Sequence, residues 1–251
     1  MKGALAALAL AAGIALAASV PADAAEPCGT SPELLESRFA LPRTGMALAG
    51  GRPLTIVALG SSSTQGIGAS DPSHAYPAVL ERQLAQRFPR SPITVLNRGV
   101  GGQDADQMLA RLDADVFAES PDLVVWQTGT NSALRDSDVE EFTSLVLGGV
   151  RRMQEAGIDV LLMGVQRSPK VDVAPHRLAY AENLRVLAEL SRVPFLPRYE
   201  IMSAWLDQGR MTMDEMIDRD GLHMTDRSYL CLAEAAAGMI ANLARAPIAS
   251  R

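Results

Sequence analysis

The sequence is poor in aromatic residues, in histidine and in clustered positive charge. Phe, Trp and Tyr make up 4% of the 251 residues, so the chain has few rings on which bases or long sugar chains could stack. The formal net charge is −6 and no basic block occurs, which argues against nucleic acid as the partner. Three scattered histidines and two distant cysteines form no ligand cluster, so we expect neither a metal nor another cofactor.

The N-terminus has the pattern of a secretory signal peptide. Lys2 gives a positive start, residues 4–20 are apolar and rich in Ala and Leu, and Ala22-Asp23-Ala24 offers small residues to a signal peptidase. We expect cleavage after Ala24 and a periplasmic or secreted protein. The alternative is a membrane anchor, but the apolar run is short for a span and ends in a cleavage-like site. No stable membrane anchor is therefore expected.

The two cysteines, Cys28 and Cys231, permit one disulfide bond in an oxidising compartment. The apolar pattern over residues 226–245 predicts a helix with Cys231 on the side opposite its apolar stripe. A free thiol there would be exposed, whereas a bond to Cys28 would fasten an N-terminal arm, residues 25–52, to this last helix. We therefore predict the Cys28–Cys231 disulfide, and the alternative is two unpaired thiols.

Residues 53–251 have the length and the pattern of one α/β domain, with no linker or internal repeat. Short apolar runs that resemble strands cover residues 54–59, 93–96, 123–127, 160–165 and 194–196. Each run is continuous rather than alternating, as expected for strands covered on both faces. Helical patterns between them predict a mostly parallel five-stranded sheet with helices on both faces.

Four helices between these strands can be placed by their apolar spacing and end signals. They are expected over residues 76–88 and 104–117, from Ser137 to just before Gly157, and from Pro175 onwards. Ser137 and Glu140 have the spacing of a capping box, and Gly157 suits the residue after a helix end. The helix after Pro175 would bury Leu178, Leu184 and Leu187.

Four polar segments lie where the predicted strands end or just before the last helix. They are Gly60-Ser61-Ser62-Ser63-Thr64, Asn97-Arg98-Gly99-Val100-Gly101-Gly102, Gly129-Thr130-Asn131 and Asp220-Gly221-Leu222-His223. Together they contain a hydroxyl nucleophile, a general base with an orienting carboxylate, and donors for an oxyanion, the set that acyl transfer needs. Each segment alone has a simpler explanation as an ordinary polar turn. The carboxyl ends of parallel strands meet at one sheet edge, which favours the interpretation of the four segments as a single active site.

The first of these segments leaves several possibilities open. It lacks the Gly-Lys-Ser/Thr ending of a phosphate-binding loop and the Gly-x-Ser-x-Gly pattern of an α/β-hydrolase elbow. Three serines compete as nucleophile, and their spacing does not choose among them. Among the histidines, we expect His74 and His176 at the surface without a nearby acidic partner, although His74 could line the mouth of a pocket. Gln166, at the end of the fourth run, could contact substrate, but a polar strand end is the simpler explanation.

In these four segments the chain resembles the SGNH/GDSL hydrolase superfamily, whose motifs occur here in the same order across the mature domain. The resemblance implies that residues 53–251 are a catalytic domain with a flavodoxin-like, three-layer α/β/α fold. It implies a catalytic Ser62, with His223 as the base and Asp220 as its partner. It also implies an oxyanion hole formed by the backbone N–H groups of Ser62 and Gly102 and the side chain of Asn131.

Two positions depart from the superfamily pattern. Ser61 stands where an aspartate is usual, and Ser132 replaces the acidic residue often found after the asparagine of the third motif. Neither position carries a proton transfer in the implied mechanism, so we expect activity to survive. The geometry of the loop at Ser62 and the choice of substrate are the properties that these changes affect.

The sequence thus predicts an exported, lipase-like serine ester hydrolase that acts through an acyl-enzyme on a small-molecule or glycan ester. Acetyl groups on envelope or extracellular glycans are the expected substrate. Lysophospholipase, thioesterase or glycan O-acetyltransferase activity on the same site stays open. From another class, a non-catalytic glycan-binding module is suggested by Ser61, although every residue that the mechanism needs is present. The sequence does not indicate the oligomeric state.

Overall fold

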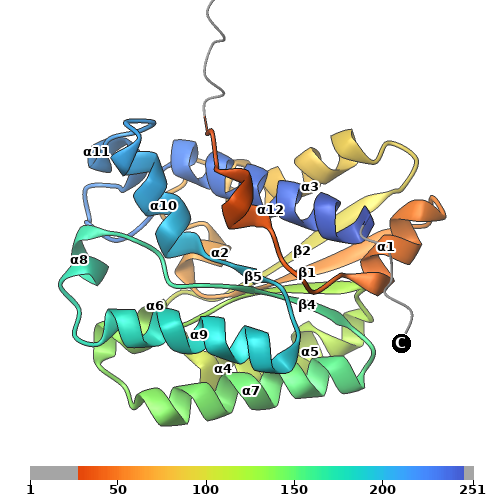
Figure 1. The fold of residues 1–251 in the computed structure, drawn as a ribbon, viewed down its shortest axis with the longest axis horizontal. Coiled ribbons are helices and arrows are strands. Elements are labelled where there is room, and N and C mark those ends of the chain that lie inside the picture. The colour runs from red at the N-terminus through yellow and green to blue at the C-terminus, as the bar shows by residue number, and fades with distance from the viewer. Residues whose placement is uncertain (1–27, 246–251) are drawn as a thin grey trace, which may run out of the picture.

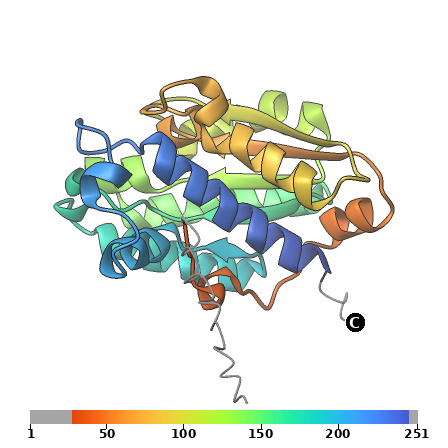
Figure 2. The ribbon, with the colours of Figure 1, turned by 90° about the horizontal axis from the view of Figure 1, so that it is seen from above.

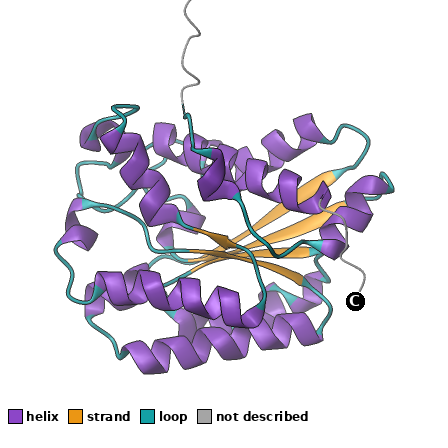
Figure 3. Ribbon diagram, viewed as in Figure 1, coloured by secondary structure: helices purple, strands orange, loops and turns teal. Residues whose placement is uncertain are grey.

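The computed structural model describes residues 28–245, which form an all-parallel five-stranded sheet between two layers of helices (Figures 1 and 3). The strands are β1 (Leu54–Gly60), β2 (Ile93–Gly99), β3 (Leu123–Gln127), β4 (Asp159–Met163) and β5 (Phe195–Leu196). Their order in the sheet is β2-β1-β3-β4-β5, which is that of flavodoxin-like folds. The three-layer α/β/α fold is confirmed. The expected signal peptide, residues 1–24, lies outside the described residues.

Helices cover both faces of the sheet. On one face lie α1 (Pro42–Ala49), α3 (Tyr76–Arg87), α10 (Arg198–Asp207) and α12 (Asp226–Arg245), and on the other α4 (Ala105–Ala110), α5 (Leu112–Asp115), α7 (Val139–Glu155) and α9 (Arg177–Ser191). Figure 2 shows α3 and α12 side by side. Short elements complete the chain: α2 (Ser62–Gln65), α6 (Thr130–Arg135), α8 (Pro169–Asp172), α11 (Met213–Met216) and the 3-10 helices η1 (Pro32–Leu35), η2 (Pro72–His74) and η3 (Phe117–Glu119). Within residues 28–245, no helix combines the length and the apolarity needed to cross a bilayer.

Strand β1 divides the interior into two cores because successive side chains of a strand point to opposite faces. Ile56 and Ala58 face the core beneath α3 and α12, whereas Val57 and Leu59 face the core beneath α4 and α7. The central strands are buried on both faces, as their continuous apolar sequence predicts. Strand β2 differs, because it lies at the edge of the sheet and its residues are only partly buried or exposed.

The helix expected over residues 104–117 is instead broken into α4, α5 and η3. The break falls at Arg111, whose backbone (φ −112°, ψ 10°) leaves the helical conformation. The Arg111 side chain donates hydrogen bonds to the Gly60 carbonyl at 3.1 Å and to Gln103 Oε1 at 2.7 Å. The helix is thus interrupted at the residue whose side chain binds the end of β1. The apolar spacing of the sequence does not reveal this interruption.

Two helix starts differ from the sequence prediction. Helix α7 is capped by Asp138, whose side chain accepts from the Glu141 N–H, rather than by Ser137. Helix α9 begins at Arg177 after His176, which has a left-handed backbone (φ 54°). This start leaves Leu178 outside the core at 61% exposure. Tyr180, rather than Leu178, fills the buried position in the first turns of α9.

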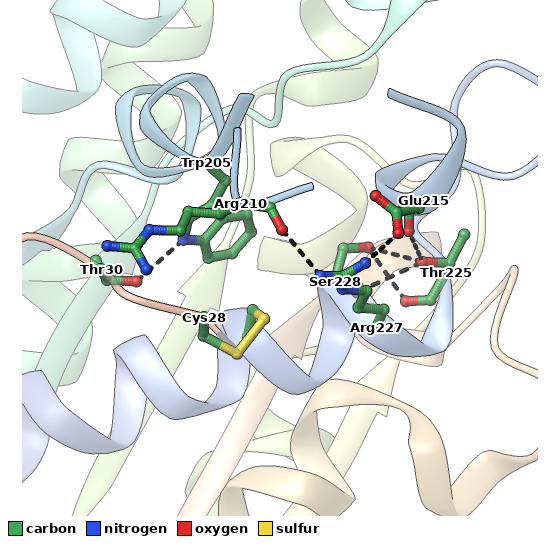
Figure 4. The surroundings of a disulfide bond; sticks show 9 residues. Cys28, Thr30, Trp205, Arg210, Glu215, Thr225, Arg227 and Ser228 are labelled. Carbon is green, nitrogen blue, oxygen red and sulfur yellow. Dashed lines mark hydrogen bonds and ion pairs between the residues drawn. A yellow bond between two sulfur atoms is a disulfide. The ribbon is translucent and has the colours of Figure 1, made fainter. Parts of the chain in front are cut away.

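A disulfide bond joins Cys28 to Cys231, the pairing expected from the sequence (Figure 4). Its surroundings differ from the expectation, because Cys231 is 1% exposed and lies in the core rather than on an open helix side. The N-terminal arm covers this side of α12, where a Cβ added at Gly238 would lie 3.5 Å from a methyl group of Leu35. Trp205 of α10 also donates to the Thr30 hydroxyl at 3.2 Å. The arm is therefore packed structure rather than a loose lead-in.

The amino ends of β3 and β4 carry carboxylates that hold α1 in place. Asp159 accepts hydrogen bonds from the Thr44 N–H at 2.8 Å and the Thr44 hydroxyl at 2.9 Å. Asp122 pairs with Arg43 Nε at 3.0 Å and also accepts from the Thr55 N–H. These contacts use the end of the sheet opposite to the polar segments singled out in the sequence.

Candidate active site

The four polar segments come together where the strands end. The short helices α2, α6 and α8, which follow β1, β3 and β4, lie toward the left of Figure 1, and α1, which precedes β1, lies on the right. Parallel strands place all of their carboxyl ends at one edge, which is where the ligands of doubly wound sheets bind.

The turn after β1 is fixed by close packing at Gly60. A Cβ added there would lie 2.1 Å from Thr64 Oγ1, so only glycine fits at this position. Helix α2 then runs from Ser62 to Gln65, and the left-handed backbone of the next residue, Gly66 (φ 101°), lets its N–H bond to the Ser62 carbonyl. Ser62 thus occupies the first position of a helical turn, where its own N–H has no partner within the helix.

The three serines of this turn have different surroundings. Ser61 and Ser63 are 3% and 2% exposed, and their hydroxyls donate to Gln127 Oε1 and Gln166 Oε1 respectively. Ser62 is only partly buried, and its hydroxyl makes no hydrogen bond with any other described residue. Of the three candidates that the sequence leaves open, Ser62 alone has a hydroxyl that is both accessible and uncommitted.

Gln127, the last residue of β3, supports this turn and was not identified from the sequence. Its Oε1 accepts from the Ser61 N–H at 3.0 Å, the Ser61 hydroxyl at 3.1 Å and the Thr64 hydroxyl at 3.1 Å. A polar residue at the end of an otherwise apolar strand is the signal that could have found it. The contact also gives Ser61 a defined partner at the position where aspartate is usual.

Asp220 and His223 form the pair that their spacing predicts. Asp220 Oδ2 contacts the ring Nδ1 of His223, and its Oδ1 accepts from the N–H groups of Leu222 and His223, each at 2.9 Å. Partial burial raises the pKa of Asp220, but the hydrogen bonds from His223 and Leu222 outweigh it and lower the pKa to about 2. The carboxylate is therefore ionised at neutral pH and can hold a proton on Nδ1, which leaves Nε2 as the free basic nitrogen.

The segments that carry Ser62 and His223 pack against each other. A Cβ added at Gly68 would lie 3.0 Å from the Cβ of His223, and Tyr229 of α12 donates to the Ile67 carbonyl at 2.7 Å. The Ile67 N–H in turn donates to the Ser62 carbonyl at 3.0 Å. No hydrogen bond joins Ser62 to His223 in the described part of the chain.

Gly102 and Asn131 lie on neighbouring turns that contact each other. Gly102 has a left-handed backbone (φ 78°), and its N–H is unpaired within residues 28–245. One N–H of the Asn131 amide donates to the Gln103 carbonyl at 2.9 Å, which leaves its second N–H available. The Gly101 N–H is occupied by Gln65 Oε1 at 2.8 Å. The turn thus presents the Gly102 N–H as a donor rather than that of Gly101.

Ser132, at the position where an acidic residue is often found, bonds to an acidic residue of another segment. Asp104 accepts from the Ser132 hydroxyl at 3.0 Å and forms an ion pair with Arg135. Arg135 also donates to the Gly102 carbonyl at 2.7 Å. Asp104 and Arg135 were not identified from the sequence, because these contacts join segments about thirty residues apart.

His74 and His176 each pair with an acidic residue from another segment. His74 Nδ1 lies 2.8 Å from Asp226 Oδ2, and His176 Nδ1 lies 2.9 Å from Asp136 Oδ1. Both partners are far away in sequence, so spacing along the chain could not reveal them. The expected surface position is confirmed, because both side chains are about half exposed or more.

The structure also places two other features relative to this site. Gln166 is 1% exposed, so the simpler reading of it as a buried strand-end residue fits better than contact with substrate. A groove of about 710 Å³ lies between residues 33–39 of the arm and helix α9. Its lining includes none of Ser62, Gly102, Asn131, Asp220 and His223, so the groove is separate from this cluster.

Residues 27–246 match the profile of the family described as the non-GDSL lipase-like family. Esterase TesA from Pseudomonas aeruginosa is 30% identical over 115 residues, which are 46% of this chain and 56% of that protein. The chain thus spans little more than half the length of this relative. An arylesterase from Vibrio mimicus is 26% identical over 160 residues, 64% of this chain and 75% of that protein.

Solved structures share the fold over most of the chain. A two-domain esterase active on acetylated mannans, crystallised with mannopentaose, superposes with a TM-score of 0.69 and 22% identity. The superposition covers 83% of this chain and 55% of that one, so the similarity concerns part of a longer protein.

Proposed function

The chain belongs to the non-GDSL lipase-like family, within the SGNH/GDSL hydrolase superfamily, and from this membership we propose that it is a serine ester hydrolase acting through an acyl-enzyme. The observation that carries the proposal is the Asp220–His223 pair, packed beside a turn whose one uncommitted and accessible hydroxyl belongs to Ser62. A nucleophile, a base and a group that orients the base are the parts that covalent acyl transfer requires.

In the proposed reaction, Ser62 Oγ attacks the ester carbonyl while His223 Nε2 takes its proton. Asp220 stays ionised and keeps the other ring nitrogen protonated, which fixes the tautomer. The oxyanion accepts hydrogen bonds from the N–H groups of Ser62 and Gly102 and from the Asn131 amide. His223 then protonates the leaving alcohol, and a water molecule activated by the same ring hydrolyses the acyl-enzyme.

We propose that the protein is exported and removes short acyl groups, above all acetyl, from glycans. The disulfide between Cys28 and Cys231 suits an oxidising compartment outside the cytoplasm, and the sequence pattern of residues 1–24 agrees with export. Support for the substrate comes from the esterase of the same fold that is active on acetylated mannans.

Ser62→Ala tests the hydrolase proposal. We expect 4-nitrophenyl acetate turnover to fall by about 10⁴-fold or more, with an unchanged thermal unfolding midpoint, because the nucleophile is lost. Ser70→Ala is a matched control, because Ser70 is also a serine beside a histidine–aspartate pair. Its hydroxyl lies 2.9 Å from His74 Nδ1 and donates to Asp226. Activity that survives Ser62→Ala, or a wild-type protein that a fluorophosphonate does not label at position 62, would contradict the proposal and favour a binding module.

The acyl group and the alcohol can be tested separately. Wild-type protein is compared on acetylated manno-oligosaccharides, on aryl esters of increasing acyl length and on lysophospholipid, with Ser62→Ala in parallel. We expect acetate release from the oligosaccharides to be the fastest reaction. Faster cleavage of long acyl chains would indicate a lysophospholipase or thioesterase, and transfer of acetyl to an added glycan would indicate an acetyltransferase.

A further inference from the structure

Gln166 contacts the chain neighbours of three residues in the proposed site. It follows β4 and is 1% exposed, so it does not reach the surface where substrate would bind. Its Oε1 accepts from the Ser63 hydroxyl at 2.8 Å, and its Nε2 donates to the Leu222 carbonyl. Ser63 directly follows Ser62 and Leu222 directly precedes His223. One amide side chain therefore connects the segment of the nucleophile with the segment of the base.

The backbone of Gln166 makes a third contact of the same kind. Its N–H donates to the Thr130 hydroxyl at 3.4 Å, and Thr130 directly precedes Asn131. The Thr130 hydroxyl also accepts from Arg198 Nη2 at 3.1 Å, and Arg198 Nε donates to the Gly164 carbonyl at 3.0 Å. Arg198 is fully buried, which lowers its pKa to about 10, so it remains charged at neutral pH. The charged Arg198 side chain thus holds the Thr130 hydroxyl, which accepts from the Gln166 N–H.

We propose that Gln166 is a positioning residue that sets the distance between the Ser62 and His223 segments, an inference that rests on the proposed esterase function. Both functional groups of its amide are needed, because Ser63 requires an acceptor and Leu222 requires a donor. In a close-packed interior these contacts leave the two segments little freedom to move apart. A displacement of about 1 Å between reacting groups can cost about 100-fold in rate, so Gln166 influences turnover without touching substrate.

The test uses three variants of the full chain with 4-nitrophenyl acetate as substrate. Gln166→Glu keeps an acceptor for Ser63 but places a carboxylate against the Leu222 carbonyl, Gln166→Met removes both contacts, and Ser63→Ala removes one. We expect kcat to fall by about 10- to 100-fold in both Gln166 variants, with KM within about twofold of wild type. Labelling of Ser62 by a fluorophosphonate should slow by a similar factor.

A double-mutant cycle distinguishes positioning from general destabilisation. If Gln166 acts partly through Ser63, then Ser63→Ala should lower kcat in the wild-type background and have little further effect in the Gln166→Met background. Thr44→Val is the control, because it removes the hydrogen bond from the Thr44 hydroxyl to Asp159 at the opposite end of the sheet. It should lower the unfolding midpoint and leave kcat unchanged.

The outcomes separate this inference from the function on which it rests. Folded Gln166 variants with wild-type kcat, or a Ser63→Ala effect of equal size in both backgrounds, would overturn the positioning role while Ser62→Ala still abolishes turnover. A fall in kcat for Thr44→Val matching that of the Gln166 variants would overturn it as well. If Ser62→Ala leaves turnover intact, the proposed function itself fails.

Discussion

The two ends of the sheet hold polar groups of different kinds for different purposes. At the amino end, Asp122 and Asp159 bind the backbone and side chains of neighbouring segments and keep α1 in place. At the carboxyl end, hydroxyls and amides such as Ser63 and Gln166 hold short turns, and the Ser62 hydroxyl makes no hydrogen bond within residues 28–245. Buried polarity alone therefore does not mark a site. What marks the carboxyl end as a site is that buried hydrogen bonds hold its turns in place while the hydroxyl of Ser62 takes no part in them.

The carboxylates at the two ends have opposite pKa shifts. Burial raises the pKa of Asp159, and hydrogen bonds from Thr44 offset this only in part. The pKa of Asp220 falls to about 2, because hydrogen bonds to its charged form outweigh burial. Asp220 therefore stabilises the folded state above the unfolded pKa, and that contribution is lost as the pH falls from about 4 toward 2. Asp159 acts in the opposite sense, since its charge is disfavoured in the folded state.

The largest effect expected from this comparison is on turnover in Asp220→Asn. The substitution replaces the carboxylate that fixes the His223 tautomer by an amide, which can donate to the ring as well as accept from it, so kcat should fall by about 10³- to 10⁴-fold. Steady-state kinetics measure the loss of kcat. Thermal unfolding at neutral pH should show only a modest fall in the midpoint, because the Asp220 side chain is 40% exposed and solvent screens its charge. A loss of less than tenfold would mean that the carboxyl end does not hold the base in the way proposed.

A smaller effect is expected for Asn131→Ala at the same end. Loss of its amide should lower kcat by about 10²- to 10³-fold if it donates to the oxyanion. The amide also binds the Gln103 carbonyl, so Asn131→Asp is a useful companion variant of nearly equal shape. Both variants should lower kcat with little change in KM for 4-nitrophenyl acetate. An unchanged kcat in Asn131→Ala would remove Asn131 from the oxyanion hole and leave two backbone donors.

The layers of the fold could be predicted because they depend on local apolar patterns. The runs at residues 54–59 and 123–127 became β1 and β3 within one residue of their expected bounds. The predicted pairing of Cys28 with Cys231 also appears, although the environment expected for Cys231 was wrong. A helix pattern alone does not show that another segment will cover its second side.

The supporting contacts of the site could not be predicted from the sequence alone. Gln127, Gln166 and Asp104 act on segments that are about 28 to 103 residues distant, so no local spacing relates them to their partners. The same reason explains the missed acidic partners of His74 and His176. By contrast, Asp220 and His223 lie three residues apart, and a tight turn is enough to join them.

The smallest effect is expected at the amino end, in the pH dependence of stability of Asp159→Asn. In the wild type, the raised pKa of Asp159 means that the folded state binds more protons than the unfolded state just above the unfolded pKa of about 3.8. This residue's contribution to stability is therefore present at lower pH and is lost as the pH rises through the folded pKa. The variant lacks this loss, so the difference in unfolding free energy between the two proteins should change between pH 3 and pH 7.

Chemical denaturation across that pH range gives the difference directly, and kcat is measured on the same samples. The variant keeps a carbonyl acceptor for Thr44 and lacks the disfavoured charge, so its stability relative to the wild type should rise as the pH rises. The value of kcat at neutral pH should equal that of the wild type, because α1 lies at the end of the sheet away from Ser62. A pH-independent difference would show that the Asp159 charge is not disfavoured in the fold. A reduced kcat would show that the two ends of the sheet are coupled, so that contacts at the amino end affect catalysis as well as stability.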